Sequence, residues 1–163
     1  MAHYGNLKVT SSTIPYGSQF NLPDTRETTI GDFMEEMDGD RGWEPGQFRR
    51  YVFEGDTILR RDVAGGDWAG FSFLDMDEVA FTSFQWYLGG TGSGAPIHFH
   101  SHAFNYIAYG RKHWFLIPPR DAVYSRKPVG RWLAEDLPAL EAEGVPVHRC
   151  VQPAGTAFFA PHG

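Results

Sequence analysis

The chain has 163 residues, of which 42% are hydrophobic and 15% aromatic, and this is enough to form one hydrophobic core. Its formal net charge is -6 and it contains no block of five or six like charges, which argues against nucleic acid as a direct partner. No window approaches 18 apolar residues, so we expect no membrane segment.

The N-terminal residues and the cysteine content bear on the compartment. The first residues, MAHYGNLKVTSST, lack a basic region followed by an apolar run, so no secretion signal is predicted. The single cysteine, Cys150, cannot form an internal disulfide, which fits a reducing compartment but does not exclude a secreted or lumenal one. We therefore expect a soluble cytoplasmic or nuclear chain, and the lumen of the secretory pathway stays an alternative.

The first predicted elements are a strand and one amphipathic helix. Residues 7–13 alternate weakly and carry β-branched side chains, which is typical of a strand. Thr29 can cap a helix whose apolar residues recur at helical spacing up to Met37, and the helix is expected to end near Gly39. Because apolar stripes usually face their own core, we expect this helix to pack on the fold rather than to bind a partner.

Aromatic strands and a glycine-rich loop come next. Residues 51–53 and 79–88 have β character, whereas residues 60–76 lack clean periodicity and are predicted to be a loop that could hold helical turns. The loop GGTGSG, residues 89–94, lacks the GxxxxGK[ST] pattern of a phosphate-binding loop. We interpret it as a place where the backbone passes close to a ligand or metal, with an ordinary long loop as the alternative.

Three histidines follow at alternating positions. If residues 97–102 (IHFHSH) form a strand, their three imidazoles project from one face. Imidazole suits Fe, Zn, Cu and Ni, so His98 and His100 are candidate ligands of one metal ion. No carboxylate accompanies them, which leaves three alternatives: an all-histidine site, a site completed by a residue beyond Gly163, or no metal and a solvent-facing polar stripe.

The later elements include a second candidate site. They are, in chain order, a hairpin of residues 107–109 and 112–117 with its turn at Gly110 and Arg111, a helix over residues 130–143 that Pro138 interrupts, and strands at residues 147–152 and 156–159. Alternation places Lys112 on the same face as Trp114, among apolar residues. A ligand carboxylate could neutralise a buried lysine there, with Asn105 donating to the same ligand, whereas a lysine that snorkels to solvent is the alternative.

Two segments, GGTGSGAPIHFH and YGRKHWFLIPP, together with residues 151–161, resemble the jumonji-C (JmjC) family of cupin-fold oxygenases. The resemblance extends over nearly the whole chain. It implies a mainly β fold, a double-stranded β-helix or jelly roll with short peripheral helices and the metal inside its mouth. It also implies one domain, residues 1–163, in which residues 1–78 are a lead-in with one helix and residues 79–163 are the barrel core. On this basis we expect the last barrel strands and a distal histidine to lie beyond Gly163, so that this stretch has no complete active site.

The resemblance implies cofactors and roles for particular residues. Catalytic members of the family hold Fe(II) and 2-oxoglutarate and hydroxylate or demethylate their substrates. By resemblance, His98 is the first metal ligand, His100 stands at the acid position, and Lys112 meets the far carboxylate of 2-oxoglutarate. Asn105 falls near a co-substrate contact, and no residue is assigned a catalytic role of its own. The expected partner is a protein or small-molecule substrate, with a homodimer as a further expectation because dimers are common for the fold.

Two departures from the family keep other functions open. His100 replaces the usual carboxylate, and Ala95 stands where many hydroxylases of the family have a threonine that hydrogen-bonds the co-substrate. Both favour a non-catalytic JmjC or cupin module used for binding or scaffolding. A three-histidine dioxygenase that needs no keto acid is the third possibility, in which Lys112 would lack its carboxylate.

Overall fold

The computed structural model describes residues 4–14, 24–39, 42–44, 46–55 and 85–162. Within these ranges no helix is both long and apolar enough to cross a membrane. The chain divides into two compact units, one of Met1–Arg41 with Arg50–Gly90 and one of Gly42–Arg49 with Thr91–Gly163. Both units are rich in antiparallel β-structure, which confirms a β-rich fold with short helices. The jelly roll and the single domain stay predictions.

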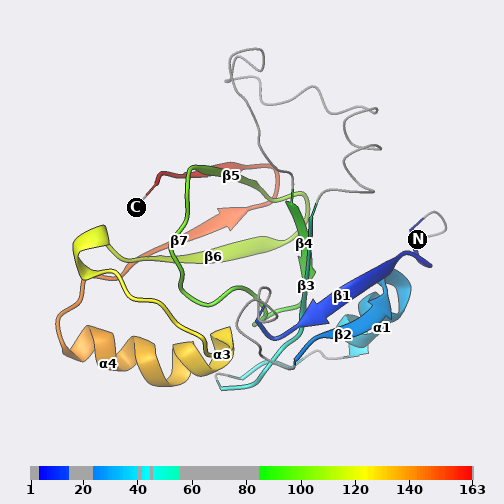
Figure 1. Ribbon diagram of the computed structural model, residues 1–163, viewed down its shortest axis with the longest axis horizontal. Coiled ribbons are helices and arrows are strands. Elements are labelled where there is room, and N and C mark those ends of the chain that lie inside the picture. Colours follow the sequence, from blue (N-terminus) through cyan, green and yellow to red (C-terminus); the bar gives the residue numbers. More distant parts are fainter. Residues whose placement is uncertain (1–3, 15–23, 40–41, 45, 56–84, 163) are drawn as a thin grey trace, which may run out of the picture. The chain divides into compact units, whose positions relative to one another are not determined.

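In its described residues, the first unit contains a four-stranded sheet and the helix α1 (Figure 1). The strand order is β2-β1-β3-β4, and every neighbouring pair is antiparallel. Its elements are β1 (Lys8–Ser12), β2 (Arg26–Thr29), α1 (Ile30–Gly39), β3 (Tyr51–Gly55) and β4 (Gln85–Gly89). The predicted strands at residues 7–13 and 51–53 are confirmed, as is the part of 79–88 that the structure describes. Residues 60–76, predicted to be a loop, lie outside the described residues.

The helix α1 begins and packs as its sequence predicts. The Oγ1 atom of Thr29 accepts a hydrogen bond from the backbone N–H of Asp32 at 3.1 Å, which caps the first turn. One turn further on, Phe33 is 1% exposed and forms the core of this unit with Val9 and Val52. The apolar stripe therefore faces its own sheet, as expected.

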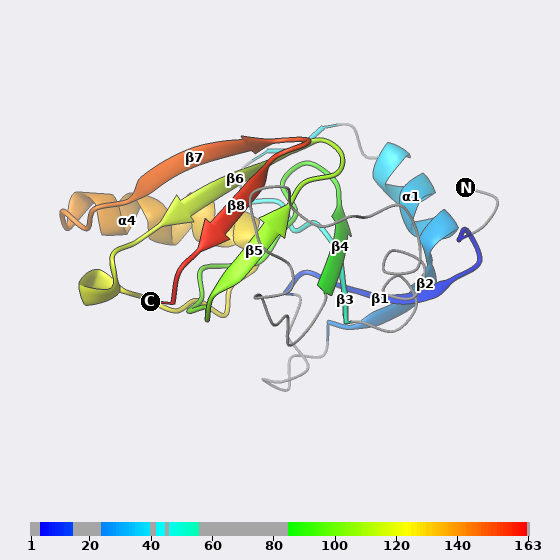
Figure 2. The same ribbon diagram turned by 90° about the horizontal axis from the view of Figure 1, so that it is seen from above.

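The second unit has two two-stranded sheets and a helical segment. The strands β5 (Ala103–Tyr106) and β8 (Ala157–Ala160) pair antiparallel, and so do β6 (Arg111–Leu116) and β7 (His148–Pro153). Figures 1 and 2 show β6 and β7 between the β5-β8 pair and the helical segment. Side chains on opposite faces of β6 explain this order. The Trp114 ring stacks on Phe158 of β8 at 4.4 Å, whereas the Phe115 ring meets Trp132 of the helical segment edge-on at 5.7 Å.

The helical segment is interrupted as Pro138 predicts. It consists of α3 (Val129–Arg131), a π-helical turn η3 (Trp132–Asp136) and α4 (Leu137–Ala142), and it follows a short 3-10 turn, η2 (Pro119–Asp121). Because Pro138 has no N–H, the regular ladder cannot run through it, and the wide turn ends at Asp136, two residues before the proline. Gly144, with φ of 80°, closes the segment, and the N–H of Val145 reaches the carbonyl of Leu140 at 2.9 Å.

The predicted hairpin at residues 107–117 is wrong. The turn at Gly110 is present, with φ of 80°, but β5 pairs with β8 and β6 pairs with β7. The reason lies in the backbone of the turn itself, which bonds to the turn at residues 153–156. The N–H of Ile107 donates to the Thr156 carbonyl at 3.2 Å, and the N–H of Gly155 donates to the Ile107 carbonyl at 2.8 Å. Two stacked corners thus direct their strands into different sheets.

Candidate functional site

The histidine segment, residues 97–102, is not a strand, so that prediction is also wrong. The pairing of β5 with β8 begins at Ala103 and Ala160, and the next position along β8 is Pro161, which has no N–H to donate to a ladder. The segment is instead held from another side. The N–H of Ser125 donates to the Ile97 carbonyl at 3.0 Å, and the Phe99 ring stacks on Tyr124 at 6.5 Å.

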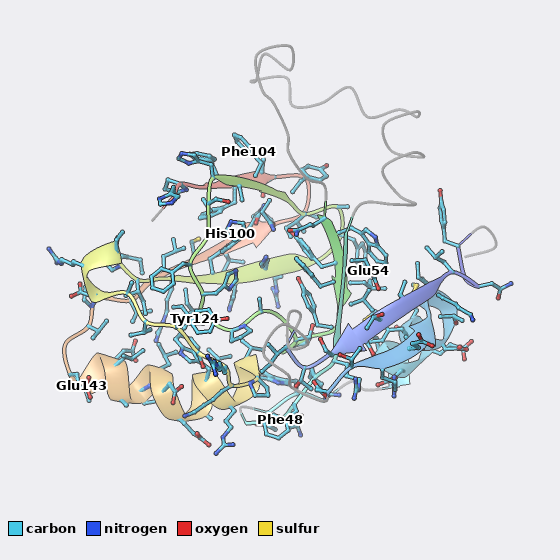
Figure 3. The ribbon with its side chains drawn as sticks, viewed as in Figure 1. Phe48, Glu54, His100, Phe104, Tyr124 and Glu143 are labelled. Carbon is cyan, nitrogen blue, oxygen red and sulfur yellow. The ribbon has the colours of Figure 1, made fainter. Side chains whose placement is uncertain are left out.

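Figure 3 shows where these parts lie relative to one another in the second unit. His100 is drawn on the segment that leads into β5, and Phe104 is on β5 itself. Tyr124 lies on the connection that precedes the helical segment, whose last turn is followed by Glu143. The histidine segment therefore leads directly into β5, which begins at Ala103.

The hydrogen bonds of His98 and His100 fix which nitrogen of each ring carries the hydrogen. The Nδ1 atom of His98 lies 2.7 Å from the Pro96 carbonyl oxygen, and that of His100 lies 2.8 Å from the Ser101 carbonyl oxygen. A carbonyl can only accept, so each Nδ1 carries the hydrogen, and in the neutral ring Nε2 keeps its lone pair. Histidines that ligate metals are commonly held in this way, with the second ring nitrogen bonded to a carbonyl.

The spacing of the two rings suits a shared ion. Their centroids are 5.6 Å apart and their planes make an angle of 54°. A ligating imidazole nitrogen lies about 2.1 Å from the metal, which puts its ring centroid about 3 Å away and limits two rings on one ion to about 6 Å. Burial lowers the pKa of His98 below its ordinary value, and the nearby His100 and Lys112 lower it further, although the bond to Pro96 opposes them. The neutral ligating form is thereby favoured.

The third imidazole, His102, is set apart from this pair. Its ring stacks on Phe159 at 5.7 Å, and its Nδ1 atom accepts a hydrogen bond from the backbone N–H of His162 at 3.0 Å. In the neutral ring the hydrogen of His102 is then on Nε2. In the part of the chain that the structure describes, no group of three or more histidine, cysteine, aspartate or glutamate side chains is placed to hold a metal. His98 and His100 therefore remain a pair of candidate ligands.

The ammonium of Lys112 lies over an aromatic ring, as the alternation of β6 predicts. Its Nζ atom is 4.1 Å from the centroid of Trp114, within the range of a cation–π contact. Burial lowers the pKa of Lys112 from 10.5 to about 8. A lysine that snorkelled to solvent would not be desolvated in this way, so the inward orientation is favoured over that alternative.

Asn105 on β5 presents an amide oxygen that needs a donor. Its Oδ1 atom is buried and has no hydrogen-bond partner among the described residues. A buried amide oxygen without a partner costs free energy, and such groups are usually matched by water or a ligand. Asn105 lies in register with Phe158, and Phe158 stacks on Trp114. The structure thus connects Asn105 to the ring that carries the Lys112 ammonium.

Gln152 on β7 connects these residues, and the sequence analysis missed it. Only 4% of its surface is exposed. Its Oε1 atom accepts a hydrogen bond from Nε1 of Trp114 at 2.8 Å, and its Nε2 atom donates to the carbonyls of Asn105 at 2.8 Å and Thr156 at 2.9 Å. Gln152 is also the register partner of Lys112. The sequence of β7, HRCVQP, gave no signal for it, because His148 and Arg149 make the strand polar at other positions too.

Comparison with known proteins finds relatives over part of the chain. JmjC domain-containing protein 8 of Rattus norvegicus is 38% identical over 76 residues, that of Mus musculus 35% over 74, and that of Homo sapiens 36% over 76. These matches cover 44 to 45% of this chain and 28% of each relative. No protein-family model matches, and no solved structure matches. The chain is therefore related to JmjC proteins, as its resemblance predicted, and it spans well under half of the length of these relatives.

Proposed function

We propose that this JmjC-related chain is part of an oxygenase that uses Fe(II) and 2-oxoglutarate to hydroxylate or demethylate a protein. Two observations together carry the proposal: a desolvated ammonium on β6 and an unsatisfied amide on β5, linked through Trp114 and Phe158. The Lys112 Nζ atom lies over Trp114 on β6, and the buried Oδ1 atom of Asn105 on β5 has no partner in the described parts. An oxygenase of this class needs such a cation for the far carboxylate of its keto acid.

The residues of this chain fit a dicarboxylate better than a neutral ligand. A carboxylate on Lys112 would restore the charged state that burial disfavours, because an opposite charge raises a lysine pKa. Asn105 carries both an amide oxygen and an NH2 group, so its side chain could accept from a ligand or donate to one of its carboxylate oxygens. Trp114 and Phe158 would exclude water from the same space, which strengthens the ion pair.

The two imidazoles, His98 and His100, would hold the metal through their Nε2 atoms. Bound Fe(II) would supply oxygen activation coupled to oxidation of the keto acid. The hydrogen bonds to Pro96 and Ser101 orient the rings before any metal arrives. Because an imidazole ligand carries no negative charge, this pair would bind Fe(II) more weakly than a histidine with a carboxylate.

A non-catalytic JmjC module, kept for binding or scaffolding, is the second candidate. The observation in its favour is His100, an imidazole that stands where catalytic members of the family carry an acid. Ala95, in place of a threonine that bonds the co-substrate, points the same way. In this function the barrel would present its surface to a partner protein or to a second copy of itself, and His98 would have no role in binding.

Ligand binding separates the two candidates. We would measure Fe(II) affinity without oxygen, with and without 2-oxoglutarate, for the wild type, His98→Ala and Lys112→Met. The oxygenase predicts Fe(II) binding that 2-oxoglutarate strengthens, loss of metal in His98→Ala, and loss of the keto-acid effect in Lys112→Met. The matched control is His102→Ala, because the His102 ring stacks on Phe159 and should not contribute to the site. Wild-type affinity no higher than that of His98→Ala would overturn the oxygenase and leave the binding module.

A further inference from the structure

The hydrogen bonds of Gln152 connect its own strand, β7, with two other strands of the second unit and with the turn that precedes the fourth. Its side chain bonds to Trp114 on β6, to the carbonyl of Asn105 on β5 and to the carbonyl of Thr156, the residue before β8. We propose that Gln152 is the positioning residue that fixes the distance between Lys112 and Asn105, and that it thereby sets the length of the dicarboxylate that the site accepts. This inference rests on the proposed function, because it deepens the account of the same site.

The orientation of the Gln152 amide cannot be reversed. A glutamine amide has two donor hydrogens and one oxygen, and here both hydrogens point at carbonyl oxygens while the oxygen receives the indole N–H. Turning the amide over would place its oxygen against two carbonyls and its NH2 group against the Trp114 N–H. Each of these pairs is repulsive and buried, so one orientation is strongly preferred.

This orientation determines where the cation lies. The Nε1–H···Oε1 bond prevents the Trp114 ring from rotating in its own plane, and the stack on Phe158 at 4.4 Å holds the ring plane. The Lys112 ammonium, 4.1 Å from the ring centroid, is therefore placed by a ring that Gln152 orients. Gln152 acts on the cation through Trp114 and need not touch the ligand.

The same amide determines where the β5 end of the site lies. Its Nε2 atom holds the Asn105 backbone carbonyl at 2.8 Å, and no ladder bond joins β5 to β6 or β7, since β5 pairs with β8. The hydrogen bond from the Gln152 side chain to Asn105 is thus a direct polar link between the β6-β7 sheet and the β5-β8 sheet. A ligand that meets Lys112 at one end and Asn105 along its length must match the spacing that this link sets.

The test compares keto diacids of different length. We would measure the binding of oxaloacetate, 2-oxoglutarate and 2-oxoadipate, with four, five and six carbons, in the presence of Fe(II) and without oxygen. The variants are Gln152→Met, which keeps a similar volume without hydrogen bonds, and Trp114→Phe, which removes only the indole N–H and part of the ring. Thr156→Val is the control, because it removes the Oγ1 bond to Pro153 and leaves the carbonyl that Gln152 uses.

The expected result is a change in selectivity beyond any loss of affinity. Wild type should prefer one length, and Gln152→Met should weaken that ligand about tenfold, as expected for lost hydrogen bonds, while the other lengths change less. Trp114→Phe should show the same trend, and the double variant should lose less than the product of the two single losses, because both variants lack the bond between Gln152 and Trp114. The indole N–H resonance of Trp114 should shift in Gln152→Met and stay unchanged in Thr156→Val.

Two results would overturn the inference, and they are distinguishable. Equal weakening of all three diacids in Gln152→Met, or losses that multiply in the double variant, would mean that Gln152 only stabilises the fold. Absence of binding by the wild type for every diacid would overturn the proposed function and the inference with it. If Gln152→Met fails to fold, Trp114→Phe measures the same bond from its other end.

Discussion

The Nζ atom of Lys112 lies 4.1 Å from the ring centroid of Trp114, two positions further along the same strand. Alternation puts both side chains on the face of β6 that meets the β5-β8 pair, where Trp114 stacks on Phe158. A cation in such a place is costly for the fold, and its desolvation is visible in its lowered pKa. A site that retains a costly charge is a candidate for function, and this gives a direct test.

Replacing Lys112 by methionine should stabilise the fold and abolish binding of the keto acid. Methionine has a similar shape and brings no charge into the space beside Trp114, so we expect the free energy of unfolding to rise by about 1 to 2 kcal/mol at pH 7. Urea unfolding measures the first effect, and calorimetric titration with 2-oxoglutarate measures the second. Lys8→Met is the control, since Lys8 is exposed on β1 and its replacement should change stability by no more than about 0.5 kcal/mol. A destabilised Lys112→Met would show that the ammonium supports the fold.

The pH dependence of stability should carry the signature of Lys112. Its pKa is about 8 in the folded chain against 10.5 for an ordinary lysine, so between these values the unfolded chain binds more protons. Stability contributed by this group therefore rises with pH from about 8 to about 10.5, with a slope that approaches about 1.4 kcal/mol per pH unit. We would measure urea unfolding of wild type and Lys112→Met at several pH values between 7 and 10. The difference between their free energies of unfolding gives the contribution of Lys112 at each pH. A difference that does not change with pH would contradict the lowered pKa.

Binding of 2-oxoglutarate should respond to the same titration with the opposite sign. The carboxylate needs the ammonium form, and above pH 8 a growing fraction of the unliganded protein has neutral Lys112. We expect the dissociation constant to increase by up to about tenfold per pH unit above pH 8. Below pH 8, Lys112 is already charged, so its titration should not change the dissociation constant. Titration calorimetry between pH 7 and 9.5 would measure it. A dissociation constant that is constant over this range would remove Lys112 from the binding site.

Two glycines with the same backbone angle should differ in their tolerance of alanine. Gly92 and Gly144 both have φ of 80°, so a side chain at either is strained by about 1 to 2 kcal/mol. At Gly144 a Cβ atom would meet open space, whereas at Gly92 it would lie 2.1 Å from the ring of Trp43. We expect Gly144→Ala to cost about 1 kcal/mol and Gly92→Ala about 3 kcal/mol or more in the free energy of unfolding. Equal costs, measured by urea unfolding, would show that the Trp43 ring moves aside freely.

Elements whose residues act on their near neighbours could be predicted from the sequence. The cap at Thr29, the apolar stripe through Phe33 and the interruption at Pro138 each depend on interactions within a few positions, and all three are present. The wrong hairpin and the wrong strand at residues 97–102 have a different origin. Both regions have strand-like sequences, but pairing depends on distant partners, and Pro161 and the turn at residues 153–156 decide it.

In the candidate site, too, local sequence pattern predicts some residues, whereas others depend on partners far away in the chain. Lys112 could be predicted because alternation along β6 shows that a charge faces an apolar neighbour, Trp114. Gln152 could not, because its role comes from a hydrogen bond to Trp114 over 38 positions and from a register between β6 and β7 that local pattern does not specify. Spacing put His102 on one face with His98 and His100 only if residues 97–102 formed a strand, and His102 was not among the candidate ligands; in the structure it bonds to His162 instead.

Restoring a carboxylate at position 100 should show whether the site is an oxygenase centre. In His100→Asp the ion would gain a negatively charged oxygen ligand in place of a neutral nitrogen, and we expect Fe(II) affinity to rise about tenfold, with faster oxidation of 2-oxoglutarate. Anaerobic Fe(II) titration measures the affinity, and succinate release measures the oxidation. His102→Asp introduces the same charge beside Phe159, away from the ring pair, and should leave both quantities unchanged. If His100→Asp also leaves both unchanged, position 100 does not face a metal, and the chain is better described as a JmjC-related binding module.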